Sequence, residues 1–163
     1  IDLDLLRALA ENRPEWSLVI VGPVGVGIDT SPLAALPNVR LLGHRNRALL
    51  PRYLKGFDVC LNPFRRSELT RTVSPLKFYE YLASGRPVAS VPMPEIQEFA
   101  DVVEFGEGLE GFLAAVERAL ADTPERKRRR LQRASENSWE SRVQFMMHHI
   151  NAALQRRQAG ARR

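Results

Sequence analysis

The sequence predicts an α/β fold in which a Rossmann-like, doubly wound parallel sheet is followed by C-terminal helices. Short, continuous apolar runs, such as residues 18–21 and 58–61, are typical of strands buried on both faces of a parallel sheet. Apolar residues at helical spacing fill the segments between these runs. The chain has 163 residues, 44% of them hydrophobic, which is enough for one sizeable core. This alternation predicts right-handed crossovers, with ligands at the carboxyl ends of the strands.

The chain begins with a predicted helix. Leucines recur at helical spacing from residue 3 to about residue 12, and Pro14 ends the pattern. Asp2 and Asp4 have the outline of a metal-binding DxD motif, but no third ligand lies nearby in the sequence. Because carboxylates are favoured at the positive end of a helix dipole, we interpret both as helix-start residues.

A glycine-rich turn follows the first predicted strand, over 18–21. The turn, GPVGVG, begins at Gly22 and lacks the GxGxxG spacing of a dinucleotide site. The next segment contains Pro32 and is too short for the helix that such a site requires. We therefore expect a flexible loop over a nucleotide cleft.

The second predicted strand covers residues 38–42 and ends at Gly43. His44 and Arg45 then lead into a helix over about 48–56, in which leucines and a tyrosine form the apolar face. By itself, His44 is typical of an exposed residue in a surface loop, since loops commonly carry exposed polar residues.

The loop after the strand over 58–61 leads to the clearest helix signal in the chain. Ser74 is a good N-cap, Pro75 suits the first helical position and Gly85 ends the helix, which predicts a helix over about 75–84. Its first turn directs backbone N–H groups and a partial positive charge toward the preceding loop, where an anion can bind. Three arginines lie beside that loop, namely Arg65, Arg66 and Arg71.

Lys77 and Glu80 lie one turn apart near the start of this helix. Lys77 adds a full positive charge to the anion site, and a carboxylate at Glu80 can accept hydrogen bonds from two neighbouring hydroxyls, as in a ribose. The alternative is an ordinary exposed i,i+3 ion pair with no ligand.

The remaining sequence divides into the end of the α/β pattern and a helical extension. We expect residues 1–123 to form the Rossmann-like domain and residues 124–163 to form helices packed on it. The last elements predicted before residue 124 are a strand over 88–91, a short helix to about residue 100, a strand at 102–103 and an amphipathic helix over 109–120.

The segment SPLKFYEYLASGRPV, residues 74–88, resembles the donor-binding segment of the glycosyl transferases group 1, a group of retaining enzymes with the GT-B fold. LVIVGP, NVRLLGH, FDVCLNPF and SW extend the resemblance over most of the chain. The resemblance implies that this is the C-terminal half of a GT-B fold, which binds a nucleotide-diphosphate sugar. An N-terminal half of the same protein, preceding Ile1, is then expected to bind the acceptor.

The resemblance also supplies candidate site residues. In the family a Glu, seven residues and a second Glu bracket the loop and helix start; the second matches Glu80, whereas the first falls on Thr72. Since the first Glu is implicated in handling the transferred sugar, the donor sugar is left open. In the family, backbone groups just after the glycine that matches Gly43 hold the base, which makes His44 and Arg45 candidates, and the turn at Gly22 lies near the donor. The expected substrate-binding residues are Gly22, His44, Arg45, Thr72, Val73, Ser74, Pro75, Leu76, Lys77 and Glu80. No catalytic residue is assigned, and no metal or cofactor is expected.

The net charge of +5 is unevenly distributed, and residues 124–163 contain 11 Lys and Arg against 3 acidic residues. The run ERKRRRLQR has no interleaved aromatics and no groove-reading motif, so we interpret it as a solvated helix face and expect no specific nucleic-acid binding. Two function classes remain: the donor-binding half of a sugar transferase, which would fold but not transfer sugar by itself, or a non-enzymatic α/β interaction module that binds through this basic helix.

Cysteine usage and hydropathy suggest a cytoplasmic protein. Cys60 is the single cysteine and lies in an apolar run, so it is expected in the core, and no disulfide can form within the chain. The sequence opens with no charged-then-apolar leader, and no apolar run approaches the roughly 20 residues that span a bilayer. Peripheral membrane contact stays open for the full protein.

Overall fold

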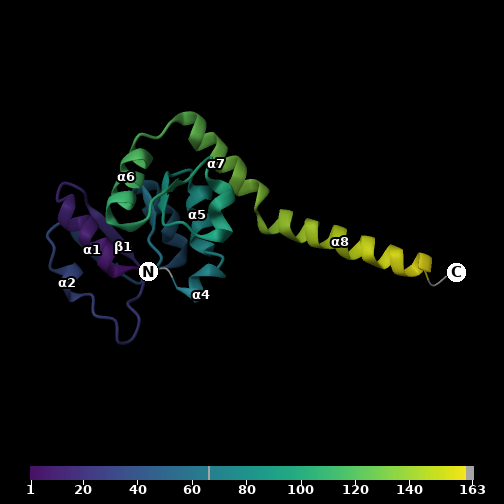
Figure 1. The fold of residues 1–163 in the computed structure, drawn as a ribbon, viewed down its shortest axis with the longest axis horizontal. Coiled ribbons are helices and arrows are strands. Elements are labelled where there is room, and N and C mark those ends of the chain that lie inside the picture. Colours follow the sequence, from purple (N-terminus) through teal and green to yellow (C-terminus); the bar gives the residue numbers. More distant parts are fainter. Residues whose placement is uncertain (66, 161–163) are drawn as a thin grey trace.

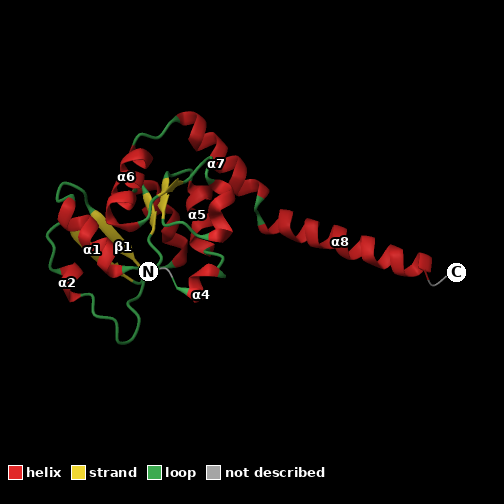
Figure 2. Cartoon of the chain, in the orientation of Figure 1, coloured by secondary structure: helices red, strands yellow, loops and turns green. Residues whose placement is uncertain are grey.

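Strands and helices alternate along the chain, as the sequence predicts (Figure 1, Figure 2). The computed structural model describes residues 1–65 and 67–160. The strands are β1 (Leu18–Val21), β2 (Val39–Gly43), β3 (Cys60–Asn62), β4 (Val88–Ser90) and β5 (Glu104–Phe105). The helices are α1 (Leu3–Asn12), α2 (Ser31–Ala34), α3 (Leu50–Gly56), α4 (Glu68–Arg71), α5 (Leu76–Ser84), α6 (Gly108–Leu120), α7 (Pro124–Glu136) and α8 (Trp139–Gly160), with 3₁₀ helices η1 (Arg47–Leu49) and η2 (Pro94–Phe99).

The strands form two parallel sheets, whereas the sequence predicts one. β1 pairs with β2, and Leu18 lies opposite Val39. β4 lies between β3 and β5, and Cys60 lies opposite Val88. The α/β class with parallel strands is confirmed, but the doubly wound sheet is interrupted, since no pairing joins β1 to β3 among the described residues. Residues of both strands line a cavity, which is described below.

The larger core surrounds the sheet of β3, β4 and β5. Phe78 of α5 and Phe99 of η2 are fully buried there, with their rings edge to face and their centroids 5.0 Å apart. Such an aromatic pair stabilises the fold by about 0.5 to 1.5 kcal/mol beyond the stabilisation from burying the apolar surface of the rings. A smaller core joins α1, α2 and the sheet of β1 and β2 through Leu6, Leu33 and Val39. Phe78 therefore anchors α5, which carries Lys77 and Glu80, in the larger core.

α5 begins at Leu76 with Pro75 as its N-cap, which corrects the predicted cap at Ser74. Pro75 is extended, with ψ of 97°, and its ring is buried, whereas Ser74 is exposed and its side chain caps no helix N–H group. Burial of Pro75 therefore sets where the chain enters α5. Although serine is a favoured N-cap residue, Ser74 does not cap this helix. The predicted stop is confirmed, because Gly85 ends the helix in the left-handed conformation with φ of 72°.

The last strand lies two residues later than predicted. β5 comprises Glu104 and Phe105 rather than residues 102–103. Val102 and Val103 are buried in the turn after η2, where both of their backbone N–H groups donate to the Phe99 carbonyl at 2.9 Å. Apolar burial without sheet pairing therefore explains why these valines resemble a strand in the sequence.

A short helix, α4, lies in the segment predicted to be a loop. The Ser67 N–H donates to Thr70 Oγ1 at 2.8 Å, and the Thr70 N–H donates to Ser67 Oγ at 3.2 Å. This reciprocal pattern resembles a capping box, which stabilises the first turn of a helix. The sequence analysis missed this helix-start signal, in which two hydroxyl side chains, Ser67 and Thr70, lie three residues apart.

α7 packs against α5 through a buried arginine. Arg130 is only 1% exposed, and its guanidinium donates to the Gly85 carbonyl at 3.0 Å and to Asp122 Oδ1 at 2.9 Å. Other members of the basic run also bind acidic residues of the domain, since Arg126 pairs with Glu104 and Arg129 pairs with Asp101. Much of the charge in the run is therefore engaged within the fold, which corrects the expected solvated helix face.

α8 projects away from the rest of the chain (Figure 1). At its start the Arg142 guanidinium lies over the Tyr79 ring, 4.8 Å from the centroid. Farther along, its apolar side chains are exposed, among them Phe145, Met146 and Ile150. The sequence predicts that residues 124–163 pack on the domain; within the described part of this range, such packing extends to α7 and the start of α8. None of the helices that the structure describes is long and apolar enough to cross a membrane.

Candidate functional site

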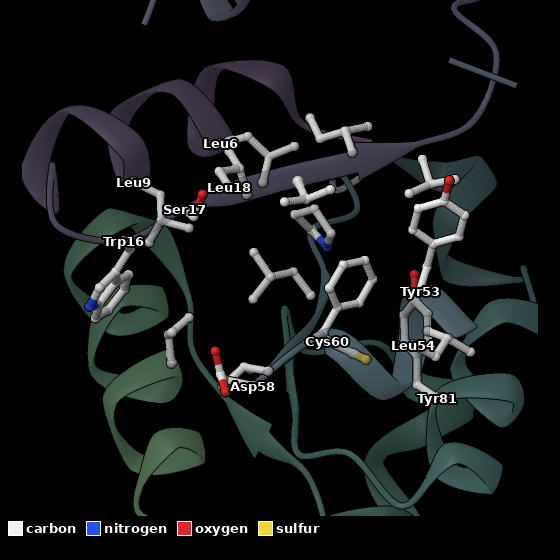
Figure 3. Close-up of a pocket in the computed structure, with 18 of the residues that line it drawn as sticks. Leu6, Leu9, Trp16, Ser17, Leu18, Tyr53, Leu54, Asp58, Cys60 and Tyr81 are labelled. Atoms are coloured by element: carbon white, nitrogen blue, oxygen red, sulfur yellow. The ribbon is translucent and has the colours of Figure 1, made fainter. Parts of the chain in front are cut away.

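A cavity of about 690 Å³ separates β1 from β3. Helices α1 and α6 contribute one part of its wall, and α3 and α5 contribute another (Figure 3). Leu6, Leu9 and Leu18 make the wall apolar on the α1 side, where Figure 3 shows them. Lys77 and Glu80 also line the cavity, beside Tyr53 and Tyr81 of the α3 and α5 wall. The cavity therefore has an apolar interior and a charged border at the start of α5.

α5 holds Lys77 and Glu80 on its exposed side. Phe78 and Leu82, four residues apart, face the core, so Lys77 and Glu80 lie on the neighbouring face of the helix. Lys77 Nζ donates to Glu80 Oε2 at 2.8 Å, and the side chains are 56% and 37% exposed. The i,i+3 ion pair expected as the alternative is thus formed, and it lies on the cavity wall.

A second group of predicted residues meets at the carboxyl ends of β1 and β2. The Gly22 N–H donates to the Gly43 carbonyl at 3.0 Å, which brings the glycine-rich turn beside His44 and Arg45. Arg45 Nε donates to the Tyr53 hydroxyl at 3.1 Å. Tyr53 lines the cavity, whereas Gly22, His44 and Arg45 do not, so this hydrogen bond places Arg45 beside the cavity wall.

Tyr53 lines the cavity and is a candidate that the sequence analysis missed. The sequence pattern places this tyrosine only on the apolar face of its helix. A phenol carries a polar hydroxyl beyond its apolar ring, and such a group needs a partner when it is partly buried. Arg45, eight residues earlier, supplies that partner. The contact depends on the turn between β2 and α3, so spacing in the sequence does not reveal it.

The loop before α5 is not part of the cavity wall. None of the five residues from Thr72 to Leu76 lines the cavity. Thr72, Ser74 and Leu76 are exposed, Val73 is half-buried and Pro75 is buried. The structure therefore brings Lys77 and Glu80 to the cavity and leaves the five preceding candidates beside it.

The arginines expected beside the anion loop do not form one cluster. Arg65 Nη2 donates to Asp4 Oδ2 at 2.7 Å, which directs this arginine to the start of α1. The neighbouring Asp2 accepts the Leu5 N–H at 3.0 Å, so the two acids act as helix-start residues, as predicted. Arg66 and the side chain of Arg71 lie outside the described residues.

Burial keeps two further groups of the cavity wall protonated. It raises the pKa of the Cys60 thiol to about 12, and it raises the pKa of the Tyr81 hydroxyl to about 12. Both groups are therefore neutral at pH 7, and Cys60 offers no thiolate nucleophile. The charged side chains that line the cavity are Lys77 and Glu80 at the start of α5, and Glu15 and Asp58. In residues 1–65 and 67–160, no group of three or more His, Cys, Asp and Glu side chains could hold a metal ion.

Comparison with known proteins agrees with this architecture. The fold is similar to the crystal structure of WaaG, a glycosyltransferase involved in lipopolysaccharide biosynthesis, with a TM-score of 0.61 and 17% identity, covering 83% of this chain and 38% of that one. Over 126 residues the chain is 32% identical to a protein described as a teichuronic acid biosynthesis glycosyltransferase, TuaH of Bacillus subtilis (strain 168).

The match to TuaH covers 74% of this chain and 32% of TuaH, so the chain spans about a third of that relative's length. The family model described as glycosyl transferases group 1 matches residues 3–126, which is well over half of the chain. Its matched range includes every candidate residue from Gly22 to Glu80. The chain therefore belongs to the glycosyl transferases group 1 family.

Proposed function

We propose that this chain is the donor-binding half of a glycosyltransferase. It binds the nucleoside diphosphate of a nucleotide sugar, while an N-terminal half of the same protein binds the acceptor and completes the cleft. Membership of the family supports the transferase activity. Coverage of 32% of TuaH and 38% of WaaG supports the division of the cleft between this chain and a further part of the protein.

The observation that carries the proposal is the Lys77–Glu80 pair on the wall of an apolar cavity. The two oxygens of the Glu80 carboxylate can accept hydrogen bonds from both hydroxyls of a ribose. Lys77 and the first N–H groups of α5 then offer positive charge to the diphosphate. An exposed ion pair contributes at most about 1 kcal/mol. A ligand that satisfies both charges can therefore displace the pair at small cost.

The base is proposed to lie on the side of Gly22, His44 and Arg45. Their turn stands at the carboxyl ends of β1 and β2, where ligands of parallel sheets bind. The hydrogen bond from Arg45 Nε to the Tyr53 hydroxyl helps to position the backbone of the turn that contains His44 and Arg45 beside the cavity. Backbone groups after Gly43 would then read the edge of the base, as the resemblance implies.

The sugar is proposed to lie toward the loop before α5, which comprises Thr72, Val73, Ser74, Pro75 and Leu76. Where the family has a carboxylate, Thr72 offers a neutral hydroxyl. A neutral group forms weaker hydrogen bonds with sugar hydroxyls than a carboxylate does. We therefore assign Thr72 to the selection of the donor sugar and not to the binding of the nucleotide.

The chemical contribution of this half is stabilisation of the leaving diphosphate. Positive charge from Lys77 and from the helix dipole of α5 would offset the negative charge that develops as the glycosidic bond to the diphosphate breaks. Both are held by a helix whose Phe78 is fully buried, so they need little reorganisation during the reaction. We assign no catalytic acid, base or nucleophile to this chain.

The test is calorimetric titration of the full-length protein with UDP, GDP, ADP, CDP and TDP, and with the matching nucleosides. The proposal predicts that one diphosphate binds more tightly than its nucleoside, and that Glu125→Gln leaves this affinity unchanged. Glu125 forms an equally simple i,i+3 pair with Arg128 on α7, with side chains 73% and 72% exposed, and neither residue lines the cavity. If none of the five diphosphates bound, the donor-binding role would be lost.

A further inference from the structure

α8 carries an apolar face that lies open to solvent in the described part of the chain. Six large apolar side chains of this helix are each between 47% and 70% exposed, namely Trp139, Val143, Met146, Met147, Ile150 and Leu154. At 3.6 residues per turn, these six positions fall within about 100° of the helix circumference. They therefore form one continuous apolar face, the α8 stripe.

Polar side chains occupy the side of α8 that faces away from the stripe. Gln144, His148 and Gln155 are exposed there. Phe145 lies on that side as well; it is 66% exposed, and its ring centroid is 4.4 Å from that of His149. α8 is therefore amphipathic over residues 139–154, with Phe145 as an exposed aromatic residue outside the stripe.

The charge of α8 is positive. Residues 139–157 contain three arginines, Arg142, Arg156 and Arg157, and a single acidic residue, Glu140. Arg156 and Arg157 are exposed at the end away from the domain, whereas the Arg142 guanidinium lies over the Tyr79 ring at the other end. A positively charged amphipathic helix with an exposed tryptophan is typical of helices that lie in the interface of a membrane with anionic lipids.

A second copy of the chain is a less suitable partner for the α8 stripe. Trp139, Val143, Met146 and Ile150 have the spacing of a coiled-coil seam, but that seam continues with Ala153 and then Arg157. The apolar part thus covers about two heptads, whereas a coiled coil needs three or four. Pairing would also bring two positively charged helices together, which like-charge repulsion disfavours. An anionic surface instead complements the charge of the helix.

We propose that the α8 stripe binds the surface of a membrane that contains anionic phospholipids. Its apolar side chains would enter the boundary between head groups and acyl chains, while the arginines bind the lipid phosphates. The stripe is about 22 Å long from Trp139 to Leu154. Because α8 projects away from the rest of the chain (Figure 1), a flat surface can reach most of this length. The proposal does not depend on nucleotide binding.

The test is sedimentation of the full-length protein with vesicles of phosphatidylglycerol and phosphatidylcholine, compared with vesicles of phosphatidylcholine alone. The proposal predicts binding to the anionic vesicles that weakens as salt rises. Phe145→Glu is the matched control, because it adds a negative charge outside the stripe, and it should lower the partition constant by about fivefold. Ile150→Glu adds the same charge within the stripe and also removes a buried aliphatic side chain. Its partition constant should be lower by a further factor of about 10 to 100.

Three results would overturn the proposal. Equal losses in the two variants would mean that charge alone attracts the protein to the vesicles. Failure of the full-length protein to bind the anionic vesicles would assign the stripe to another part of the same protein. A dimer that forms without vesicles, and that Ile150→Glu but not Phe145→Glu dissociates, would assign it to a second copy. If circular dichroism showed that Ile150→Glu does not fold, Ile150→Gln compared with Phe145→Gln would decide in the same way.

Discussion

Lys77 and Glu80 form an ion pair of 2.8 Å across one turn of α5, on the wall of the cavity between β1 and β3. The pair places one positive and one negative charge within reach of the same ligand. A phosphate needs the cation, and a pair of hydroxyls needs the carboxylate. Substitutions of the two residues should therefore cause different binding defects.

Lys77→Ala should weaken the binding of a nucleoside diphosphate but not of its nucleoside. Hydrogen bonds to charged groups contribute about 1.5 to 3 kcal/mol, so affinity for the diphosphate should fall by about tenfold to 100-fold. Calorimetry with the diphosphate and the nucleoside measures both values. Arg128→Ala, in the exposed pair with Glu125, is the matched control. An equal loss for both ligands would show that Lys77 does not act on the phosphates.

Thr72→Glu should leave nucleotide binding nearly unchanged. Thr72 is exposed and lies outside the cavity that Lys77 and Glu80 line. A carboxylate at this position restores the family pattern and should alter which nucleotide sugar binds best. Competition of several nucleotide sugars against one labelled diphosphate tests both points. A large loss of diphosphate affinity would mean that this position faces the phosphates instead.

The basic run of α7 should bind DNA weakly and without sequence preference. Arg126, Arg129 and Arg130 already pair with acidic residues of the domain. The remaining attraction is screened by salt, so affinity should fall steeply between 50 mM and about 200 mM salt. Fluorescence anisotropy with several duplexes measures this dependence. Tight binding to one sequence at physiological salt would revive the interaction-module alternative.

Arg130→Met should destabilise the fold strongly. Arg130 is 1% exposed and joins Asp122 to the carbonyl of Gly85, where α5 ends. Removal of one partner of a fully buried pair costs about 3 to 5 kcal/mol; because the Asp122 side chain is 21% exposed and stays partly hydrated, the loss here should be near the lower value, about 3 kcal/mol. Urea unfolding followed by tryptophan fluorescence measures the change. Arg128→Met, in an exposed pair, should cost less than about 1 kcal/mol, and equal effects of the two variants would contradict the buried role.

Features that depend on local chemistry could be predicted from the sequence. Asp2 caps α1 because a carboxylate at a helix start accepts a nearby N–H, and Gly85 ends α5 because glycine tolerates a positive φ. The Lys77–Glu80 pair follows from helical spacing alone. All three depend on residues fewer than five positions apart.

Features that depend on tertiary packing could not be predicted in this way. Burial of Pro75 overrides the cap propensity of Ser74, and Arg65 turns to Asp4 on a distant part of the chain. The Arg45–Tyr53 contact depends on how a turn folds back on a helix. The interruption between β1 and β3 leaves no trace in periodicity, because each strand remains apolar whether or not its second edge is paired.

The affinity of Glu80→Gln for a nucleoside diphosphate tests the donor-binding role most directly. The substitution keeps the shape of the side chain and removes its charge, so each bond to a ribose hydroxyl falls from charge-assisted to neutral strength. Affinity should fall by about 1 to 3 kcal/mol, or roughly 5-fold to 150-fold, with an unchanged unfolding midpoint. Glu125→Gln should bind like the parent protein. If Glu80→Gln also bound the diphosphate as tightly as the parent, Glu80 would not hold the ribose, and its pair with Lys77 would be only a surface ion pair.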